Sequence, residues 1–437
     1  HRDLHSFPTR RSSDLKKTVE NKQLGYKELT LSNGAKVVLK KTDFKNDEIL
    51  FDATANVGYS AFSKQDELLP FLFDNAIGVS GLGNFSNTEL QKALAGKQVS
   101  VGTQISPFGH GLSGRSTPKD IETLMQLIHL EMTAVKKDQK SFDNLKNTYV
   151  TVLANKDNNP NMVYQDSVQS TLYLGSKMAR IPSSDDVKSI SYDRILELQK
   201  LYYGNAKDFT FYFVGNYDEK TLLPLIEQYI ASLPNNGFKL KNKQIPYAQG
   251  EVNNTFEKAM GNPQSQAREI WQAKSPLSLK TMVLADISAR LLEMKYLRTI
   301  REEMSAAYSA GARYGVIRDY DNKCSISLTA MAQLNPEKAD AAIPYFKKGM
   351  EETIQDAVDN DLAKIKEILL KQAGVDAKTN SHWLDVLNLY VRYGIDEQTG
   401  YKEMVKNITE KEISDFLQNT MLKSGNHFQI IMKAVKE

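Results

Sequence analysis

Arg301 and Tyr308 lie seven residues apart, where an amphipathic helix gives way to a strand of small residues. A guanidinium presents five donors in a fixed plane, which suits the recognition of oxygen acceptors. A phenol can donate a hydrogen bond to an oxygen on which negative charge develops. The pattern of helix, arginine, seven-residue step, tyrosine and small strand therefore favours a binding role for this pair. The structural alternative is that Arg301 pairs with an acidic neighbour while Tyr308 fills the core.

The helix predicted over 279–303 must position the arginine. Ile287, Leu291 and Met294 follow one another at steps of four and three residues and so share one face. Arg301 follows Met294 by seven residues and is predicted to continue this face. We therefore expect its charge either to pair inside the fold or to project into a cavity.

The strand predicted over 307–316 must position the tyrosine. Alternation puts Tyr308 in phase with apolar residues, and the opposite face carries residues small enough for another backbone to approach closely. The residues in phase are Ala310, Ala312, Tyr314 and Val316, and those opposite are Ala307, Ser309, Gly311 and Gly315.

This segment resembles the Arg/Tyr motif of the pitrilysin/insulinase family of zinc peptidases. The resemblance implies that Arg301 binds main-chain carbonyls of a peptide substrate. It also implies that the Tyr308 hydroxyl both contacts substrate and stabilises the tetrahedral intermediate, which would make Tyr308 catalytic. The substrate is then expected to be an unfolded peptide, held partly by strand addition at a sheet edge.

Catalysis in that family needs an inverted His-x-x-Glu-His motif on a helix, with the histidines as zinc ligands and the glutamate as base. The helix predicted over 67–77 instead places Pro70 and Asp74 at the histidine positions and Phe73 at the base position. Proline cannot ligate a metal, and phenylalanine cannot accept a proton. We expect no zinc in this chain and no peptidase activity from the chain alone.

The scattered histidines do not replace the missing motif. His129 and Glu131 are two residues apart on a predicted helix, so they point to different faces. His110 lies in a glycine-rich turn without a nearby partner, His382 precedes Trp383 in a helical stretch, and His427 begins the last strand. Zinc is therefore expected on a further, N-terminal half.

Length and composition limit the number of domains and the classes of function that remain. A chain of 437 residues predicts two domains, and a net charge of +3 is too small to indicate nucleic-acid binding. No apolar run approaches the roughly 18 residues that span a bilayer. Cys324, the one cysteine, lies on the apolar side of an alternating run and is predicted to be a buried structural thiol.

Residues 1–15 differ from the rest of the chain, because Thr9 to Leu15 read as a translated sequencing adapter. We expect this leader to be non-native and the reading frame to have been cut near residue 16. A disordered leader or transit peptide is the alternative.

The chain after this leader contains a faint internal duplication. Val187 to Ser191 recurs as Val405 to Thr409, at an offset of 405 − 187 = 218 residues, before a helix and a final strand in both places. Segregated strands and helices predict an α+β fold of two homologous domains, each a mainly antiparallel sheet with helices packed on one face. The predicted domains are 16–235 and 251–437, joined by a linker over 236–250. The resemblance implies a fold like that of the LuxS/MPP metallopeptidases.

We interpret the chain as the C-terminal, non-metal half of a zinc metalloendopeptidase that degrades peptides or unfolded segments. Its partner would be an N-terminal catalytic half, to which this half contributes substrate binding and chamber closure. One alternative is a separate non-catalytic subunit of a heterodimeric peptidase; another is a structural or peptide-binding protein. A periplasmic or cell-envelope location is implied by the resemblance alone.

Overall fold

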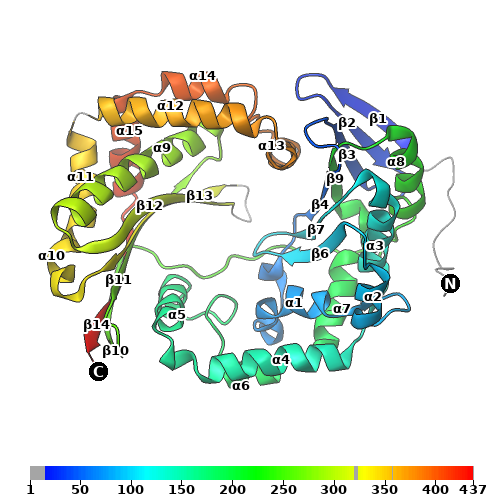
Figure 1. Cartoon of the computed structure of the whole chain (residues 1–437), viewed down its shortest axis with the longest axis horizontal. Coiled ribbons are helices and arrows are strands. Elements are labelled where there is room, and N and C mark those ends of the chain that lie inside the picture. Colours follow the sequence, from blue (N-terminus) through cyan, green and yellow to red (C-terminus); the bar gives the residue numbers. More distant parts are fainter. Residues whose placement is uncertain (1–14, 319–322, 357, 437) are drawn as a thin grey trace. The chain divides into compact units, whose positions relative to one another are not determined.

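The computed structural model describes residues 15–318, 323–356 and 358–436, so the predicted leader lies outside the described residues except for Leu15. The chain forms two compact units (Figure 1). Unit 1 contains the chain up to Ala154 together with Pro182–Lys243 and Asp376–Thr399. Unit 2 contains Asn155–Ile181, Gln244–Val375 and Gly400–Glu437.

Unit 1 is built on a seven-stranded sheet in which β3 runs parallel to β9 and the other neighbours are antiparallel. Strictly alternating burial along β4 shows that one of its faces is fully covered. In order across the sheet, the strands are β1 (Leu15–Asn21), β2 (Tyr26–Leu31), β3 (Lys36–Lys41), β9 (Thr210–Gly215), β4 (Ile49–Ala55), β7 (His110–Ser116) and β6 (Val99–Ile105). A separate small pair consists of β5 (Gly81–Leu82) and β8 (Val135–Lys136). The helices are α1 (Phe73–Gly78), α2 (Asn87–Ala93), α3 (Ile121–Thr133), α4 (Gln139–Ala154), α6 (Ser184–Ser189), α7 (Tyr192–Tyr203), α8 (Glu219–Leu225) and α13 (Asn380–Tyr393).

Unit 2 is built on a five-stranded sheet. Its strands, in order, are β10 (Glu251–Met260), β14 (Asn426–Lys436), β11 (Ser265–Ser275), β13 (Cys324–Leu334) and β12 (Ala307–Arg318). Its helices are α5 (Pro160–Leu172), α9 (Leu279–Tyr296), α10 (Ala339–Ala342), α11 (Pro344–Gln355), α12 (Asp359–Asp376), α14 (Tyr401–Asn407) and α15 (Glu410–Asp415). The predicted burial of Cys324 is confirmed, since its side chain has no exposed surface.

The two sheets share one topology. The order β3-β9-β4-β7-β6 in unit 1 matches β10-β14-β11-β13-β12 in unit 2, including the single parallel pair at the same place. The ends of the duplicated segments cap the helices that follow: Ser191 accepts a hydrogen bond from the backbone of Arg194, and Thr409 forms a capping box with Glu412. The α+β architecture with two related sheets is thus present in the structure.

One helix of each half packs in the unit built mainly from the other half, and the sequence pattern did not predict this exchange. The helix α5 comes from the first half of the chain but covers β10 and β14 in unit 2. Its counterpart α13 comes from the second half but covers β4 and β9 in unit 1. The apolar contacts are Tyr164, Val168 and Leu172 on Ile270, Phe428 and Ile430 for α5, and Leu387 with Trp383 on Val38, Tyr212 and Val214 for α13.

One local prediction in the first half is wrong. The helix predicted over 67–77 begins only at Phe73, because Pro70 lacks the backbone N–H that a helix interior needs and instead opens a short 3-10 turn. The hairpin at Asn33-Gly34 forms, but only Gly34 has a positive φ, at 89°, so the turn is not type I′.

Candidate functional site

Arg301 lies in a π-helical segment, Leu297–Glu303, that follows α9 without a break. The prediction of one regular helix over 279–303 is wrong, and so is the placement of Arg301 on its buried face. The Arg301 side chain is exposed, while its neighbour Ile300 is completely buried. Because π-helical hydrogen bonds run from residue i to i+5, each turn takes an additional residue and the later side chains change direction.

The helix ends abruptly after the π-helical segment. Ser305 adopts a left-handed conformation with φ of 48°, which is costly for a residue with a side chain. The N–H of Ala306 donates to the Ile300 carbonyl, six residues back along the chain, at 2.9 Å. Lys338 donates to the carbonyls of Met304 and Ser305, at 3.0 and 3.2 Å. These contacts fix the direction in which the chain enters β12.

Tyr308 is the extra residue of a β-bulge. Ala307 pairs with Leu334 and Ser309 pairs with Gln333, which leaves Tyr308 without a partner on β13. The predicted phase with Ala310 is therefore broken, since a bulge changes the aim of the side chain it carries. Ala310 is buried, but 71% of Tyr308 is exposed.

Arg301 and Tyr308 thus flank a single tight turn, and both side chains are presented to solvent. No hydrogen bond or ion pair among the described residues engages the guanidinium of Arg301 or the hydroxyl of Tyr308. The strand β12 lies at the end of its sheet and pairs only with β13 among the described strands. Chemically, this arrangement offers a planar cationic donor and a neutral phenolic donor beside an edge strand.

The degenerate metal motif lies in unit 1 and has become structural. The Phe73 ring is completely buried, so it fills the core. Asp74 accepts a hydrogen bond from the backbone N–H of Ile105 at 3.0 Å, which ties α1 to the end of β6. With Pro70 unable to ligate and an Asp74 oxygen committed to the sheet, these positions do not fit a zinc ion.

Replacing Asp74 by asparagine should flatten the dependence of stability on pH. Burial raises the pKa of Asp74 to about 6, although the hydrogen bond from the Ile105 backbone opposes this. A raised carboxyl pKa means that the folded state holds its proton longer, so this group's stability is lost as pH rises from about 4 to about 6. We expect Asp74→Asn to be more stable than the parent chain by up to ~3 kcal/mol above pH 7 and equal to it near pH 4.

Urea unfolding of both chains at pH 4.5 and 7.5 measures this difference. Asp193→Asn, at an exposed carboxylate, is the matched control and should show no such gap. A variant at position 74 that follows the parent chain at both pH values contradicts the prediction.

The described histidines bind structural partners. His110 is fully buried with both ring nitrogens against the backbone carbonyls of Val57 and Tyr202, at 2.5 and 2.9 Å. His129 contacts the Tyr229 carbonyl at 2.9 Å. Among the described residues, no group of three or more His, Cys, Asp or Glu side chains could hold a metal ion. Within the same part of the chain, no helix is long and apolar enough to cross a bilayer.

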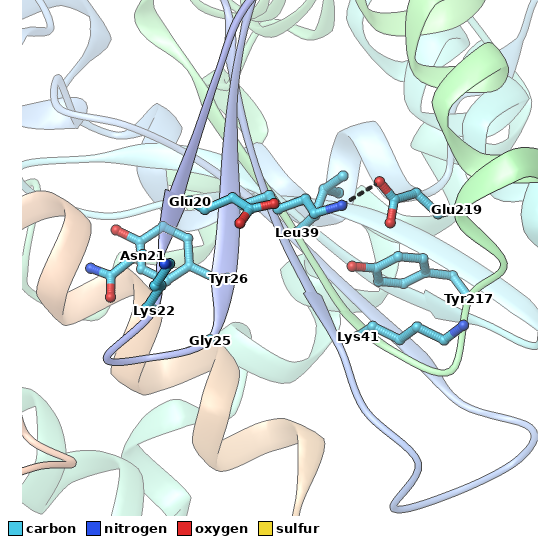
Figure 2. Close-up of a pocket in the computed structure, with 10 residues that line it drawn as sticks. Glu20, Asn21, Lys22, Gly25, Tyr26, Leu39, Lys41, Tyr217 and Glu219 are labelled. Atoms are coloured by element: carbon cyan, nitrogen blue, oxygen red, sulfur yellow. Dashed lines mark hydrogen bonds and ion pairs between the residues drawn. The ribbon is translucent and has the colours of Figure 1, made fainter.

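A cavity of about 240 Å³ in unit 1 lies between β2, β3 and the chain after β9 (Figure 2). Tyr217 and Lys41 project into the same space, and Lys27 forms an ion pair with Glu219 at 2.6 Å beside them. Its lining mixes both signs of charge and contains neither Arg301 nor Tyr308.

Three features of the candidate site were missed by sequence reasoning: the π-helical segment, the left-handed Ser305 and the bulge at Tyr308. Each is a change of backbone geometry that leaves the residue spacing unaltered, so the periodicity gave no signal. Lys338 was also missed, because it lies far along the chain from the turn that it caps.

Residues 189–369 match the family described as the peptidase M16 inactive domain, a range that includes Arg301 and Tyr308. The probable zinc protease PqqL of Escherichia coli K12 is 26% identical over 292 residues, which is 66% of this chain and 31% of that protein. The crystal structure of the periplasmic protease PqqL from E. coli has a TM-score of 0.83 at 21% identity, covering all of this chain and 48% of that one. The chain therefore spans about half the length of that relative.

The first half of the same protease, solved alone, matches less closely. Its TM-score is 0.71 at 13% identity, covering 98% of this chain and 93% of that one.

Proposed function

Because this chain belongs to the pitrilysin/insulinase family of zinc peptidases and carries its M16 inactive domain, we propose that it is the C-terminal, non-metal half of a zinc-dependent metalloendopeptidase. The exposed pair Arg301 and Tyr308 carries the proposal. In this role Arg301 binds substrate carbonyl oxygens and Tyr308 donates to the developing oxyanion. Zinc, its ligands and the general base belong to the N-terminal half.

The local geometry supports a ligand-binding role. A non-glycine residue in the left-handed region costs roughly 1–3 kcal/mol and persists only where its surroundings determine it. Here such a residue, a π-helical segment and a bulge follow one another within twelve residues, from Leu297 to Tyr308. Their joint effect is to turn two donors away from the core. The open edge of β12 offers main-chain groups to an extended peptide.

The separate-subunit alternative differs in how the two halves are connected. Genomic sequence upstream of residue 16 distinguishes them: an in-frame His-x-x-Glu-His domain supports one long chain, and a start codon with a signal peptide supports a heterodimer. The E. coli relative is a periplasmic protease. We propose the same compartment for this protein, to be tested by fractionation of cells that express the complete gene.

The role of Arg301 is tested with the chain assembled with its zinc-bearing half. Arg301→Ala should raise KM for an unfolded peptide by about 10–100-fold, the size of a lost charge-assisted hydrogen bond. The unfolding midpoint should not change, because the side chain is exposed. Arg290→Ala, at a half-exposed arginine on α9 that pairs with Asp286, is the matched control. Equal KM values for the two variants would contradict a binding role for Arg301.

A further inference from the structure

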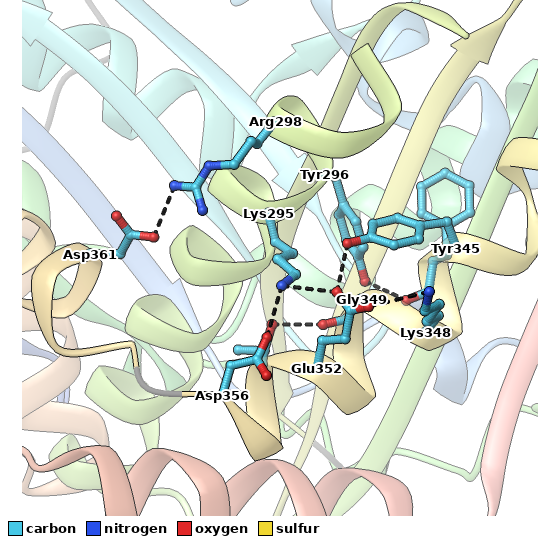
Figure 3. Close-up of polar contacts among 11 residues, drawn as sticks. Lys295, Tyr296, Arg298, Tyr345, Lys348, Gly349, Glu352, Asp356 and Asp361 are labelled. Atoms are coloured by element: carbon cyan, nitrogen blue, oxygen red, sulfur yellow. Dashed lines mark hydrogen bonds and ion pairs between the residues drawn. The ribbon is translucent and has the colours of Figure 1, made fainter. Parts of the chain in front are cut away.

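A polar network joins the last turn of α9 to α11 (Figure 3). Lys295 Nζ lies 2.9 Å from Glu352 Oε2 and 3.1 Å from Asp356 Oδ2. The Tyr345 hydroxyl donates to the same Glu352 oxygen at 2.7 Å. Hydrogen bonds from Lys295 and Tyr345 lower the pKa of Glu352, which keeps this carboxylate ionised at neutral pH. One carboxylate thus links the end of α9 to two positions on α11.

Neighbouring residues fix the backbone at the same place. The buried Tyr296 donates its hydroxyl to the Phe346 carbonyl at 2.8 Å. Its ring packs on the bare backbone of Gly349, where a Cβ would lie only 2.7 Å from the ring carbon Cε1. Arg298, the second residue of the π-helical segment, donates to Asp361 at 3.1 Å. The segment is therefore held by α11 and by the first turn of α12.

The network also reaches into the π-helical segment itself. Thr299 lies close enough to Tyr345 to oppose the rise that burial causes in the pKa of this phenol, and the Tyr345 hydroxyl also contacts Glu352. The two residues that follow Thr299 are Ile300, which is completely buried, and Arg301, which is exposed. These contacts hold a wide turn in place of the α-helical turn that the preceding sequence favours.

The direction of Arg301 depends on that wide turn. If α-helical geometry continued, Arg301 would follow Met294 and Leu291 along one face, as the residue spacing requires. A π-helix advances fewer degrees per residue, so over the five residues from Tyr296 the Arg301 side chain falls behind by about a quarter of a turn. This rotation moves it away from the Leu291 side and places Ile300 in the core.

We propose that Lys295, Tyr345 and Glu352 are positioning residues, which hold the π-helical segment and thereby keep Arg301 directed toward the peptide. This inference rests on the proposed function of Arg301. It adds a dependence of substrate binding on residues that do not themselves touch substrate.

The test replaces Lys295 by methionine, which keeps the length of the side chain and removes its charge. Lys348→Met is the matched control, because Lys348 also contacts Glu352, at 3.5 Å, but lies on α11 and does not join it to α9. Hydrogen exchange followed by mass spectrometry reports on residues 297–304, and KM and kcat for an unfolded peptide are measured on the chain assembled with its zinc-bearing half. Lys295→Arg, which retains the charge, serves as the rescue variant.

We expect Lys295→Met to speed exchange at 297–304 by about tenfold, to leave 279–290 unchanged and to raise KM about tenfold with kcat nearly constant. Lys348→Met and Lys295→Arg should resemble the parent chain. Unchanged exchange at 297–304 overturns the proposal. Faster exchange without a rise in KM also overturns it, provided that Arg301→Ala does raise KM. If Arg301→Ala leaves KM unchanged, the proposed function of Arg301 fails and the positioning proposal fails with it.

Discussion

Replacing Tyr308 by phenylalanine is expected to lower kcat of the assembled peptidase by about 10²–10³-fold, with little change in KM. One hydroxyl that donates to a developing oxyanion is worth that much in related chemistry, and its removal leaves ground-state contacts of the ring in place. The protein should remain as stable as before, because 71% of this side chain is exposed and no described residue contacts its hydroxyl.

Tyr314→Phe is the matched control, since it removes a second partly exposed tyrosine hydroxyl from the same strand. Single-turnover rates with an unfolded peptide, measured at saturating substrate, separate the chemical step from binding. If both variants retain full turnover, Tyr308 is not catalytic. A peptide-binding module without a catalytic connection would then describe the chain better.

Replacing His427 by alanine is expected to destabilise unit 2 by about 3–5 kcal/mol. His427 Nε2 lies 3.0 Å from the carboxylate of Glu269, which is only 1% exposed, and the ring stacks on Trp271. Breaking a buried pair on one side leaves the other charge without compensation, and this costs more than the pair itself contributes. Gln429 would remain the only described side chain that donates to Glu269, at 2.7 Å.

The cost of that substitution should depend on pH. Burial alone would lower the pKa of His427, but the hydrogen bond and the charge of Glu269 outweigh burial and raise it. The stabilisation is therefore complete below the unfolded value of about 6.5 and is lost as pH rises through the folded value. Urea unfolding between pH 6 and 9 should show the gap between His427→Ala and the parent chain narrowing with rising pH.

Glu251→Gln provides the comparison, because Glu251 contacts the same histidine at 3.3 Å but is 62% exposed. It should cost less than about 1 kcal/mol, as exposed ion pairs do. The buried pair does not have the predicted importance if the two variants are equally mild.

The regular parts of the fold could be predicted from the sequence because their signals are local. Ser191 and Thr409 are good N-cap residues and cap their helices, and alternating apolar residues mark β9 and β14. The late start of α1 could also have been predicted, since Pro70 is disfavoured within a helix. Each of these elements keeps the same backbone geometry along its whole length, so a constant residue period describes it.

The position of the candidate site in the sequence could be predicted, but the directions of its side chains could not. The types and spacing of Arg301 and Tyr308 identified the segment, yet the side-chain directions predicted for both residues were wrong. Periodicity assumes a constant turn per residue, and here a π-helical segment and a bulge change that turn between the two residues. The spacing of the residues does not show from which backbone N–H groups the carbonyls of this segment accept hydrogen bonds.

The sequence also did not show on which sheet α5 and α13 pack. An apolar stripe shows that a helix buries one face, but it does not show which sheet receives that face. Two helices at equivalent places in a repeat carry equivalent signals. The exchange between units 1 and 2 therefore had to be observed.

That exchange makes each repeat depend on the other for a covering helix. The chain passes between the units after residues 154, 181, 243, 375 and 399. Unit 1 provides the sheet on which α13 packs, and the first half provides the α5 that covers the sheet of unit 2. Deleting either repeat would expose apolar surface in the survivor. The sheet of unit 2, the unit that presents Arg301 and Tyr308, is therefore covered by a helix from the other repeat.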